Sequence, residues 1–224
     1  RDLRKALAAD ALLKHEIDTL GDAEVMAKLG RGDRFPEGRF LPETYVYTRG
    51  TSDLALLDRA AKAMDVALDE AWNARHKDVP LATPDEWLTL ASIVGKETGV
   101  ARERPQIAGV FARRMKIGMR LQTDPTVIYG LGDAFDGNLR RSHLQADTPF
   151  NTYTRAGLPP TPIAMPGKAS LMAAVQPAQT KALYFVARGD GSSHFSGSLD
   201  EHNRAVNKYQ RGGAVSAASA AGGN

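Results

Sequence analysis

The spacing of apolar residues predicts that much of this chain is helical. Residues 52–73 give the longest amphipathic pattern, and Ser52 stands where an N-cap residue would start the helix. The apolar face of this helix is predicted to carry Leu54, Leu57, Ala61, Met64, Ala67 and Ala71. Shorter helical patterns cover residues 3–13 and 22–29, with Gly21 between them. We therefore expect helices to dominate the first third of the chain.

A helix predicted to start at residues 83–86 and to include the mostly apolar stretch 88–100 combines a strong start signal with an unusual side chain. Residues 83–86, Thr-Pro-Asp-Glu, form a capping box with a proline in the first turn. Ile93, Val94 and Glu97 fall on one side of this helix, so a carboxylate continues an apolar stripe. Glu97 is either solvated at the helix end or desolvated, and desolvation would raise its pKa and suit it to general acid catalysis. The pattern alone favours the solvated alternative, because most Glu side chains are exposed.

The second half of the chain predicts more helices and one β-hairpin. Further helical patterns cover residues 104–116, 124–130, 167–174 and 199–209. Residues 183–187 predict a strand that Gly-Asp-Gly-Ser joins to residues 194–196, and residues 45–47 predict another short strand. Residues 131–169 hold little periodicity, and so long an irregular stretch suggests a substrate-binding region. The expected fold class is α+β, mainly helical with a small antiparallel sheet.

Composition narrows the classes of function. The 224 residues contain 29 Lys and Arg against 26 Asp and Glu, and the net charge of +3 gives no reason to expect a nucleic-acid partner. The absence of cysteine excludes disulfides, thiolate metal ligands and a cysteine nucleophile. No apolar run reaches the roughly 18 residues of a membrane span. Residues 211–224 are rich in Gly, Ala and Ser and are predicted to form a disordered tail.

Several polar residues outside the helix that carries Glu97 have both a structural and a functional interpretation. Glu103 precedes a predicted helix, where the helix dipole favours a negative charge, and Asp124 is placed to cap the next helix. Gln122, Asn151 and Tyr153 stand in loop-like stretches, which suits hydrogen bonding to a substrate although loops are polar in general. These residues are compatible with an acid–base enzyme, and they do not specify one.

Metal and nucleophile signatures are weak. His194 and His202 could be metal ligands, but their spacing matches no standard zinc signature, so no metal is predicted. The chain contains neither a Gly-x-Ser-x-Gly nucleophile elbow nor a Gly-x-x-x-x-Gly-Lys-Ser/Thr phosphate loop. The residues by themselves therefore support an α+β domain that is compatible with acid–base chemistry.

Seven motifs, taken in order, resemble those of one family. They are residues 37–45 (EGRFLPETY), 91–98 (ASIVGKET), 121–130 (LQTDPTVIYG), 150–153 (FNTY), 157–160 (GLPP), 183–186 (LYFV) and 201–203 (EHN). Each motif alone is a weak signal, whereas seven in register across residues 35–210 are specific. The chain resembles the MltG (YceG-like) family of endolytic murein transglycosylases.

This resemblance implies a catalytic transglycosylase domain over residues 36–210, preceded at residues 1–35 by the end of a small LysM-like module. It implies an enzyme at the periplasmic face of the inner membrane, held by one N-terminal membrane helix upstream of this sequence. The implied reaction cleaves the MurNAc-β-1,4-GlcNAc bond within peptidoglycan glycan strands and leaves 1,6-anhydroMurNAc ends. Peptidoglycan synthases (penicillin-binding proteins) are the expected protein partners, and no cofactor is implied.

The resemblance also assigns candidate site residues. Glu97, which precedes Thr98, matches the family's catalytic glutamate and would act as the single general acid and base. The candidate substrate-binding residues are Gln122, Asp124, Asn151, Tyr153, His194 and Glu103. Gly95 stands where family members commonly carry a second Glu, but the helical phase places Glu97, and not position 95, on the stripe of Ile93 and Val94. Two alternatives remain open: a two-carboxylate glycoside hydrolase and a peptidoglycan-binding module without catalysis.

Overall fold

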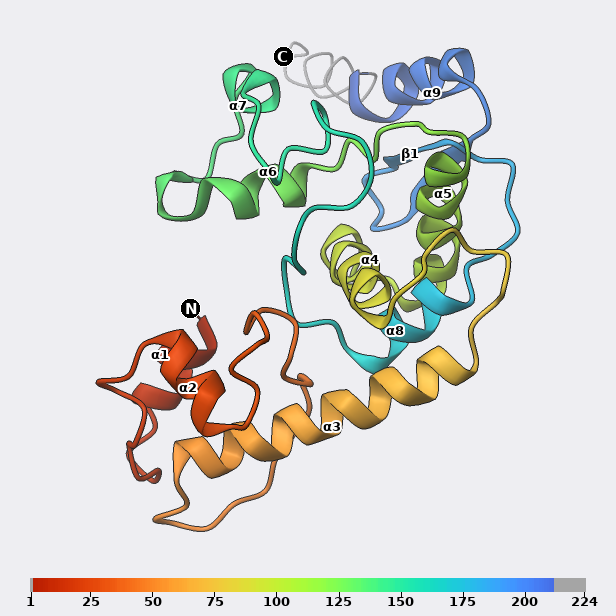
Figure 1. Ribbon diagram of the computed structural model, residues 1–224. Coiled ribbons are helices and arrows are strands. Elements are labelled where there is room, and N and C mark those ends of the chain that lie inside the picture. The colour runs from red at the N-terminus through yellow and green to blue at the C-terminus, as the bar shows by residue number, and fades with distance from the viewer. Residues whose placement is uncertain (1, 212–224) are drawn as a thin grey trace, which may run out of the picture.

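The computed structural model describes residues 2–211 and shows a helical molecule with one small sheet (Figure 1). The α-helices are α1 (Asp2–Ala8), α2 (Asp22–Lys28), α3 (Asp53–Asn73), α4 (Pro84–Glu97), α5 (Arg104–Lys116), α6 (Asp124–Leu131), α7 (Arg141–Gln145), α8 (Lys168–Val175) and α9 (Leu199–Val206). The antiparallel strands are β1 (Tyr184–Ala187) and β2 (Ser193–Ser196), and short 3₁₀ or π turns cover Ala101–Glu103, Gly132–Ala134 and Asn207–Arg211. The expected α+β class is confirmed. The predicted tail lies outside the described residues except for residue 211.

Helix α4 begins as its capping box predicts. The Thr83 hydroxyl accepts the backbone N–H of Glu86 at 3.3 Å, and the Glu86 carboxylate accepts the backbone N–H of Thr83 at 3.0 Å. Pro84 occupies the first turn, where its missing N–H would have had no helical partner. The helix ends at Glu97 because Thr98 adopts an extended backbone, with φ −146° and ψ 134°. These local signals make Glu97 the last residue of α4.

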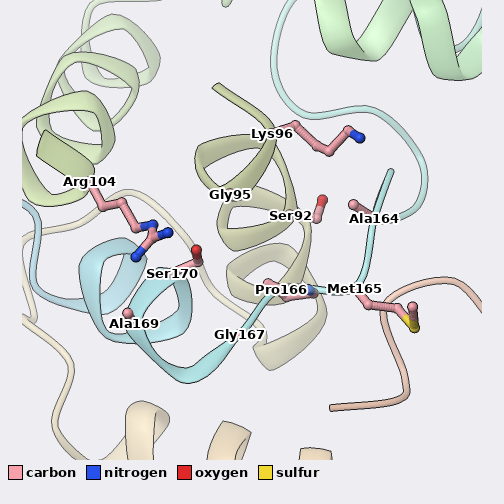
Figure 2. A pocket seen from close by; sticks show the side chains of 10 residues that line it. All are labelled: Ser92, Gly95, Lys96, Arg104, Ala164, Met165, Pro166, Gly167, Ala169 and Ser170. Carbon is pink, nitrogen blue, oxygen red and sulfur yellow. The ribbon is translucent and has the colours of Figure 1, made fainter. Parts of the chain in front are cut away.

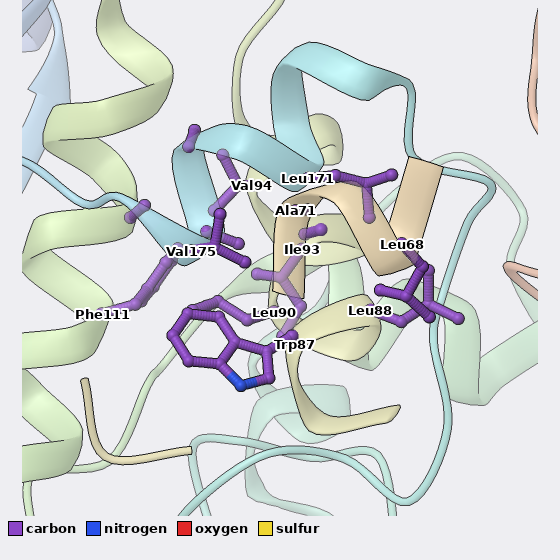
Figure 3. Close-up of a cluster of buried hydrophobic side chains, with 14 of the residues drawn as sticks. Leu68, Ala71, Trp87, Leu88, Leu90, Ile93, Val94, Phe111, Leu171 and Val175 are labelled. Atoms are coloured by element: carbon purple, nitrogen blue, oxygen red, sulfur yellow. The ribbon is translucent and has the colours of Figure 1, made fainter. Parts of the chain in front are cut away.

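The main hydrophobic core surrounds α4, the central helix of the molecule (Figures 1 and 3). Every residue from Trp87 to Val94 is buried, so this part of the helix has no solvent-facing side. Helix α8 packs most extensively against it, and α5 and α3 complete the enclosure. Trp87 also meets Trp72 of α3 edge to face, with ring centroids 6.1 Å apart. The last turn of α4 therefore projects from a rigid support.

A second core joins the N-terminal segment to the first half of α3. Its buried apolar side chains are Leu7, Leu13, Ile17, Val25, Met26, Phe40, Leu57, Ala60 and Ala61. The buried Asp53 adds a polar link, because its carboxylate accepts the backbone N–H of Glu16 at 3.0 Å. The second half of α3, with Met64 and Ala71, enters the main core instead. One helix thus serves both cores, and the origin of residues 1–35 in a LysM-like module stays a prediction.

Three local expectations are wrong. Residues 45–47 do not form a strand, because no described segment lies alongside to pair with them. The first helix ends at Ala8 and not at residue 13, since the Asp10 carboxylate accepts the N–H of Leu12 and turns the chain. Asp124 is the first residue of α6, and its neighbour Thr123 takes the cap position.

The predicted hairpin is confirmed and closes the C-terminal side of the fold. Phe185 of β1 pairs with Phe195 of β2, and the turn between the strands uses Gly189 and Gly191 at φ 90° and 85°. Phe185 packs edge to face on Phe111 of α5, with ring centroids 5.9 Å apart. Helix α9 contacts both strands. The hairpin is thereby fixed to α5, the helix that follows α4 in the chain.

Candidate active site

Glu97 lies partly buried at the end of α4, next to the start of α6. The Thr123 hydroxyl donates a hydrogen bond to Glu97 Oε1. Burial raises the pKa of Glu97, the Thr123 hydrogen bond opposes that increase, the Asp124 charge adds to it and the Arg114 charge lowers it. The net direction is upward. Glu97 is therefore the desolvated acid of the two alternatives, and not the solvated helix end that its pattern alone favoured.

The segment before α6 has an unusual backbone conformation beside Glu97. Gln122 is exposed and has φ +50°, a left-handed value that residues with a Cβ seldom adopt. Its N–H donates to the Thr152 carbonyl at 3.1 Å, and the Thr123 N–H donates to the Thr152 hydroxyl at 3.1 Å. These bonds hold Gln122 in a conformation that costs about 1 kcal/mol, and they orient Thr123 toward Glu97.

Asp124 and Tyr153 form a second polar pair near Glu97. The Tyr153 hydroxyl donates a hydrogen bond to Asp124 Oδ1. Burial, this hydrogen bond and the charges of Asp124 and Glu97 all raise the pKa of Tyr153, so its hydroxyl stays protonated and remains a donor. The structure thus brings three predicted residues, Gln122, Asp124 and Tyr153, together around Glu97.

Arg114 is a buried cation on α5. Its Nε donates to the Leu183 carbonyl at 2.7 Å, and its Nη1 donates to the Leu121 carbonyl. Its guanidinium also lies over the ring of Tyr184, 5.3 Å from the centroid. Arg114 therefore connects α5, the segment that carries Gln122 and the start of β1, and its charge lowers the pKa of Glu97.

Asn151 occupies a structural position and does not face open solvent. It is completely buried, and its Nδ2 donates to the carbonyls of His143, Leu144 and Ala146 at 3.2, 3.1 and 2.6 Å. Its Oδ1 accepts the N–H of Tyr153 at 2.9 Å. With both ends of the amide occupied, Asn151 shapes the loop that presents Tyr153. These bonds give Asn151 a scaffolding role, and the substrate contact expected of it stays a prediction.

Glu103 and His194 lie outside the group around Glu97. Glu103 is buried, and its Oε1 accepts the N–H of Ser193 at 2.8 Å, which ties the turn before α5 to β2. This hydrogen bond gives Glu103 a structural role, and the substrate contact expected of it stays a prediction. His194 is partly buried on β2 and packs near Tyr209, with ring centroids 5.6 Å apart. Whether His194 contacts substrate stays a prediction.

One group of carboxylate and imidazole side chains close enough to share a cation lies in the N-terminal segment, away from Glu97. Within residues 2–211 this group is His15, Asp18 and Asp53, in the N-terminal segment. The Asp53 carboxylate already accepts the backbone N–H groups of Glu16 and Ile17, so it serves to join this segment to α3. His194 and His202 do not belong to this group. Nothing in this arrangement brings a metal ligand set to Glu97.

Thr123 is the residue of this site that sequence reasoning missed. Its neighbour Asp124 and the proline that follows drew attention as a helix start, while Thr123 itself carried no signal of contact with Glu97. The contact joins residues 26 apart in the sequence, and it exists because α4 and α6 pack together. The one hint in the sequence was that Thr123 carries a hydroxyl and belongs to the family motif of residues 121–130.

The fold and site define the class of this protein as an α+β domain that presents one desolvated carboxyl beside a polar, loop-built surface, an arrangement suited to acid–base catalysis. The chain belongs to the YceG-like family, whose model matches residues 1–208. The expected family is therefore confirmed.

Curated relatives support this assignment. The chain is 37% identical over 173 residues to the endolytic murein transglycosylase of Bacillus subtilis strain 168, an alignment that covers 77% of this chain and 48% of that protein. It is 28% identical over 225 aligned positions to the endolytic murein transglycosylase of Streptococcus pneumoniae strain D39, covering 93% of this chain and 40% of that protein. The chain thus spans about half the length, or less, of these relatives.

A solved structure shows the same fold. The yceG-like protein lmo1499 of Listeria monocytogenes superposes with a TM-score of 0.69 at 33% identity, covering 83% of this chain and 64% of that chain. The arrangement of helices around α4 is therefore similar to that of an experimentally determined family member.

Proposed function

We propose that this protein is an endolytic lytic transglycosylase that cleaves the MurNAc-β-1,4-GlcNAc bond within peptidoglycan strands. The observation that carries the proposal is the desolvated carboxyl of Glu97, whose raised pKa favours the protonated form that a general acid needs. The names of the relatives from Bacillus subtilis and Streptococcus pneumoniae supply the substrate class. Because the chain spans only part of those proteins, the activity of the whole protein is included in this proposal.

In the proposed first step, protonated Glu97 donates its proton to the glycosidic oxygen as the bond to the muramyl C1 breaks. Thr123 donates to Oε1, so Oε2 is the oxygen that exchanges a proton with substrate. The carboxylate then accepts the proton of the muramyl C6 hydroxyl while that oxygen attacks C1 and forms the 1,6-anhydro ring. The attack is intramolecular, and it therefore has the advantage of a high effective molarity without an enzyme nucleophile. Glu97 ends the cycle protonated.

The residues around Glu97 have complementary proposed roles. Thr123 stabilises the carboxylate form between the two proton transfers, because a hydroxyl donor favours the charged acceptor. Gln122 is exposed and precedes Thr123 in the chain, so its amide is available to substrate, and the Tyr153 and Asp124 pair offers further polar atoms to the sugar rings. Asn151 holds the loop that carries Tyr153.

We further propose that the protein acts at the periplasmic face of the inner membrane on nascent strands, near peptidoglycan synthases. Within residues 2–211, no helix combines the length and the apolar character needed to cross a membrane. The support for this location is the resemblance of the motifs, and fractionation of cells that produce the full-length protein would test it.

The hydrolase alternative has one observation in its favour, because the Asp124 charge acts on Glu97 and is close enough to raise its pKa. A second carboxylate near the acid could serve as nucleophile or base. In the structure, however, the Tyr153 hydroxyl occupies Asp124 Oδ1. We therefore favour the one-carboxylate mechanism, and the product distinguishes the two.

Mass spectrometry of glycan-strand digests by the purified protein tests the proposal. The expected products end in 1,6-anhydroMurNAc, and Glu97→Gln should abolish them. Glu70→Gln, at an exposed position on α3, is the matched control and should behave like the parent. Reducing ends in place of anhydro ends would establish the hydrolase. Retention of strands without any cleavage would favour the binding module.

A further inference from the structure

A pocket lies on the side of α4 that carries Gly95, nearly opposite the side that carries Glu97. It has a volume of about 170 Å³ and is formed by the last turn of α4, the start of α5 and the segment that leads into α8 (Figure 2). The lining residues are Ser92, Gly95, Lys96, Arg104, Ala164, Met165, Pro166, Gly167, Ala169 and Ser170. Two of these ten are cations and none is an acid, so the pocket has a positive character.

Within the described part of the chain, the two cations of this pocket lack acidic partners, whereas the Ser92 hydroxyl donates to the Thr89 carbonyl at 2.7 Å and accepts the N–H of Ile163 at 3.0 Å. Among the described residues neither Lys96 nor Arg104 makes an ion pair, and Arg104 Nε is buried without an acceptor. Ser170 is 4% exposed and lines the pocket at the start of α8. Its hydroxyl is directed at the space over Gly95, because a Cβ built on Gly95 would lie 3.1 Å from Ser170 Oγ. A buried N–H donor without an acceptor is costly, which indicates that an acceptor for Arg104 Nε is missing.

The backbone adds further donors at the same place. Helix α8 starts after Gly167, and no side chain caps its N-terminus. The Ser170 N–H donates to the Gly167 carbonyl at 2.9 Å, so the N–H groups of Lys168 and Ala169, with the positive end of the helix dipole, remain at the pocket wall that Gly167, Ala169 and Ser170 form. Figure 2 shows Arg104 and Ser170 on one side of Gly95 and Lys96 on the other. Cationic side chains, a hydroxyl and free amides together suit an oxyanion.

We propose that this pocket binds a carboxylate of the substrate, namely one carried by the peptide stem of a glycan strand held at Glu97. The inference rests on the proposed function. Gly95 and Glu97 are two residues apart, about 3 Å along the helix axis and on nearly opposite sides of a helix about 10 to 12 Å wide. An extended peptide covers about 3.3 to 3.6 Å per residue, so a stem of about four residues spans from the muramyl sugar to the pocket.

Gly95 is the residue that keeps the pocket open. A larger side chain at this position would enter the space next to Ser170. Gly95→Glu would place a tethered carboxylate where the substrate carboxylate is proposed to bind, and Gly95→Gln fills the same volume without the charge. The two variants therefore separate competition by charge from simple obstruction.

Binding is tested first, without reference to catalysis. The parent protein is titrated by NMR with a tetrapeptide stem that has a free C-terminal carboxylate, with the same peptide amidated at its C-terminus, and with acetate alone. The free acid should shift the amide signals of Gly95, Ala169 and Ser170, and Arg104→Gln should weaken that binding about tenfold, as expected for loss of a charge-assisted hydrogen bond. Arg102→Gln, at an exposed position two residues away, is the matched control and should leave it unchanged.

Cleavage is tested second, on strands that carry stems and on strands from which the stems have been removed. The parent should show a higher kcat/KM on stem-bearing strands than on bare strands. Arg104→Gln should lower kcat/KM about tenfold on stem-bearing strands and leave kcat/KM on bare strands unchanged. Equal effects of Arg104→Gln on both strands, or binding of the amidated peptide as tight as that of the free acid, would overturn the inference. Binding of acetate alone, without any advantage for the stem, would assign the pocket to free small anions and overturn the substrate source. If neither strand yields anhydro ends but the tetrapeptide still binds through Arg104, the proposed function fails and the carboxylate site stands.

Discussion

Replacing Thr123 with valine keeps the shape of the side chain and removes one hydroxyl, so it isolates the hydrogen bond to Glu97. That bond favours the carboxylate and opposes the increase that burial causes in the pKa of Glu97. Without it, Glu97 should hold its proton to higher pH. A hydrogen bond to a charged group contributes about 1.5 to 3 kcal/mol, and the partly exposed position argues for the lower end.

This magnitude converts directly into a pH profile. About 1.4 kcal/mol corresponds to one pH unit, so the alkaline limb of kcat/KM should move upward by about 1 pH unit in Thr123→Val. The sign follows from the role of Glu97, because a general acid loses activity as pH rises through its pKa. The measurement is the initial rate of 1,6-anhydro end formation on purified glycan strands, across the acidic and neutral range.

Thr123→Ser is the matched control, because it keeps the hydroxyl. Its alkaline limb should coincide with that of the parent, and circular dichroism should show all three proteins folded. A Val variant whose limb stays in place, or moves to lower pH, refutes the assignment of Thr123 as the residue that positions and stabilises Glu97. A Ser variant that shifts as far as Val would attribute the effect to packing.

Three further changes address other parts of the site. Glu97→Gln should lower kcat/KM about 10²- to 10⁴-fold. Because the pKa of Glu97 is raised on folding, the contribution of its protonated carboxyl to stability is complete below the unfolded pKa and is lost as pH rises through the folded pKa. The free energy of unfolding from urea titrations at acidic and neutral pH should show this loss in the parent and not in Glu97→Gln. Gln122→Gly should relieve the strain of the positive φ at this position and leave Tm equal or higher, while loss of the amide side chain raises KM for glycan strands. A lower Tm would show that the backbone at Gln122 is not strained. Asn151→Ala should lower the free energy of unfolding by about 1 to 3 kcal/mol, since three carbonyls lose their donor, and an unchanged Tm would argue against its scaffolding role.

The elements of this fold whose signals are local could be predicted from the sequence. Helix α4 has its cap, its proline and its apolar stripe within 15 consecutive positions, residues 83–97, and it begins where these signals place its start. The hairpin of β1 and β2 was equally clear, because glycines in the turn and aromatic residues on the strands lie close together in the chain. Residues 45–47 have the same strand-like composition. They form no strand because a strand also needs a neighbour, which composition does not supply.

The site was predictable in its centre and less so around it. Glu97 could be singled out because it interrupts an apolar stripe, but its desolvation depends on Thr123 and on α6, which only the folded chain brings near. Asn151 and Tyr153 were equivalent as polar loop residues. Burial separates them, since the amide of Asn151 is used up by backbone carbonyls while Tyr153 faces Asp124. The distinction between scaffold and contact was not present in the sequence pattern.

Helix α3 runs through both hydrophobic cores, and this continuity has a measurable dynamic consequence. The helix has 21 residues and is about 30 Å long, with Leu57 and Ala61 in the N-terminal core and Met64 and Ala71 in the main core. Amide hydrogen exchange along this one helix would therefore report the opening of each core separately. If the two halves of α3 exchange at the same rate, the N-terminal segment and the main core unfold as a single cooperative unit. If the first half exchanges faster, the N-terminal segment detaches while Glu97 keeps its support.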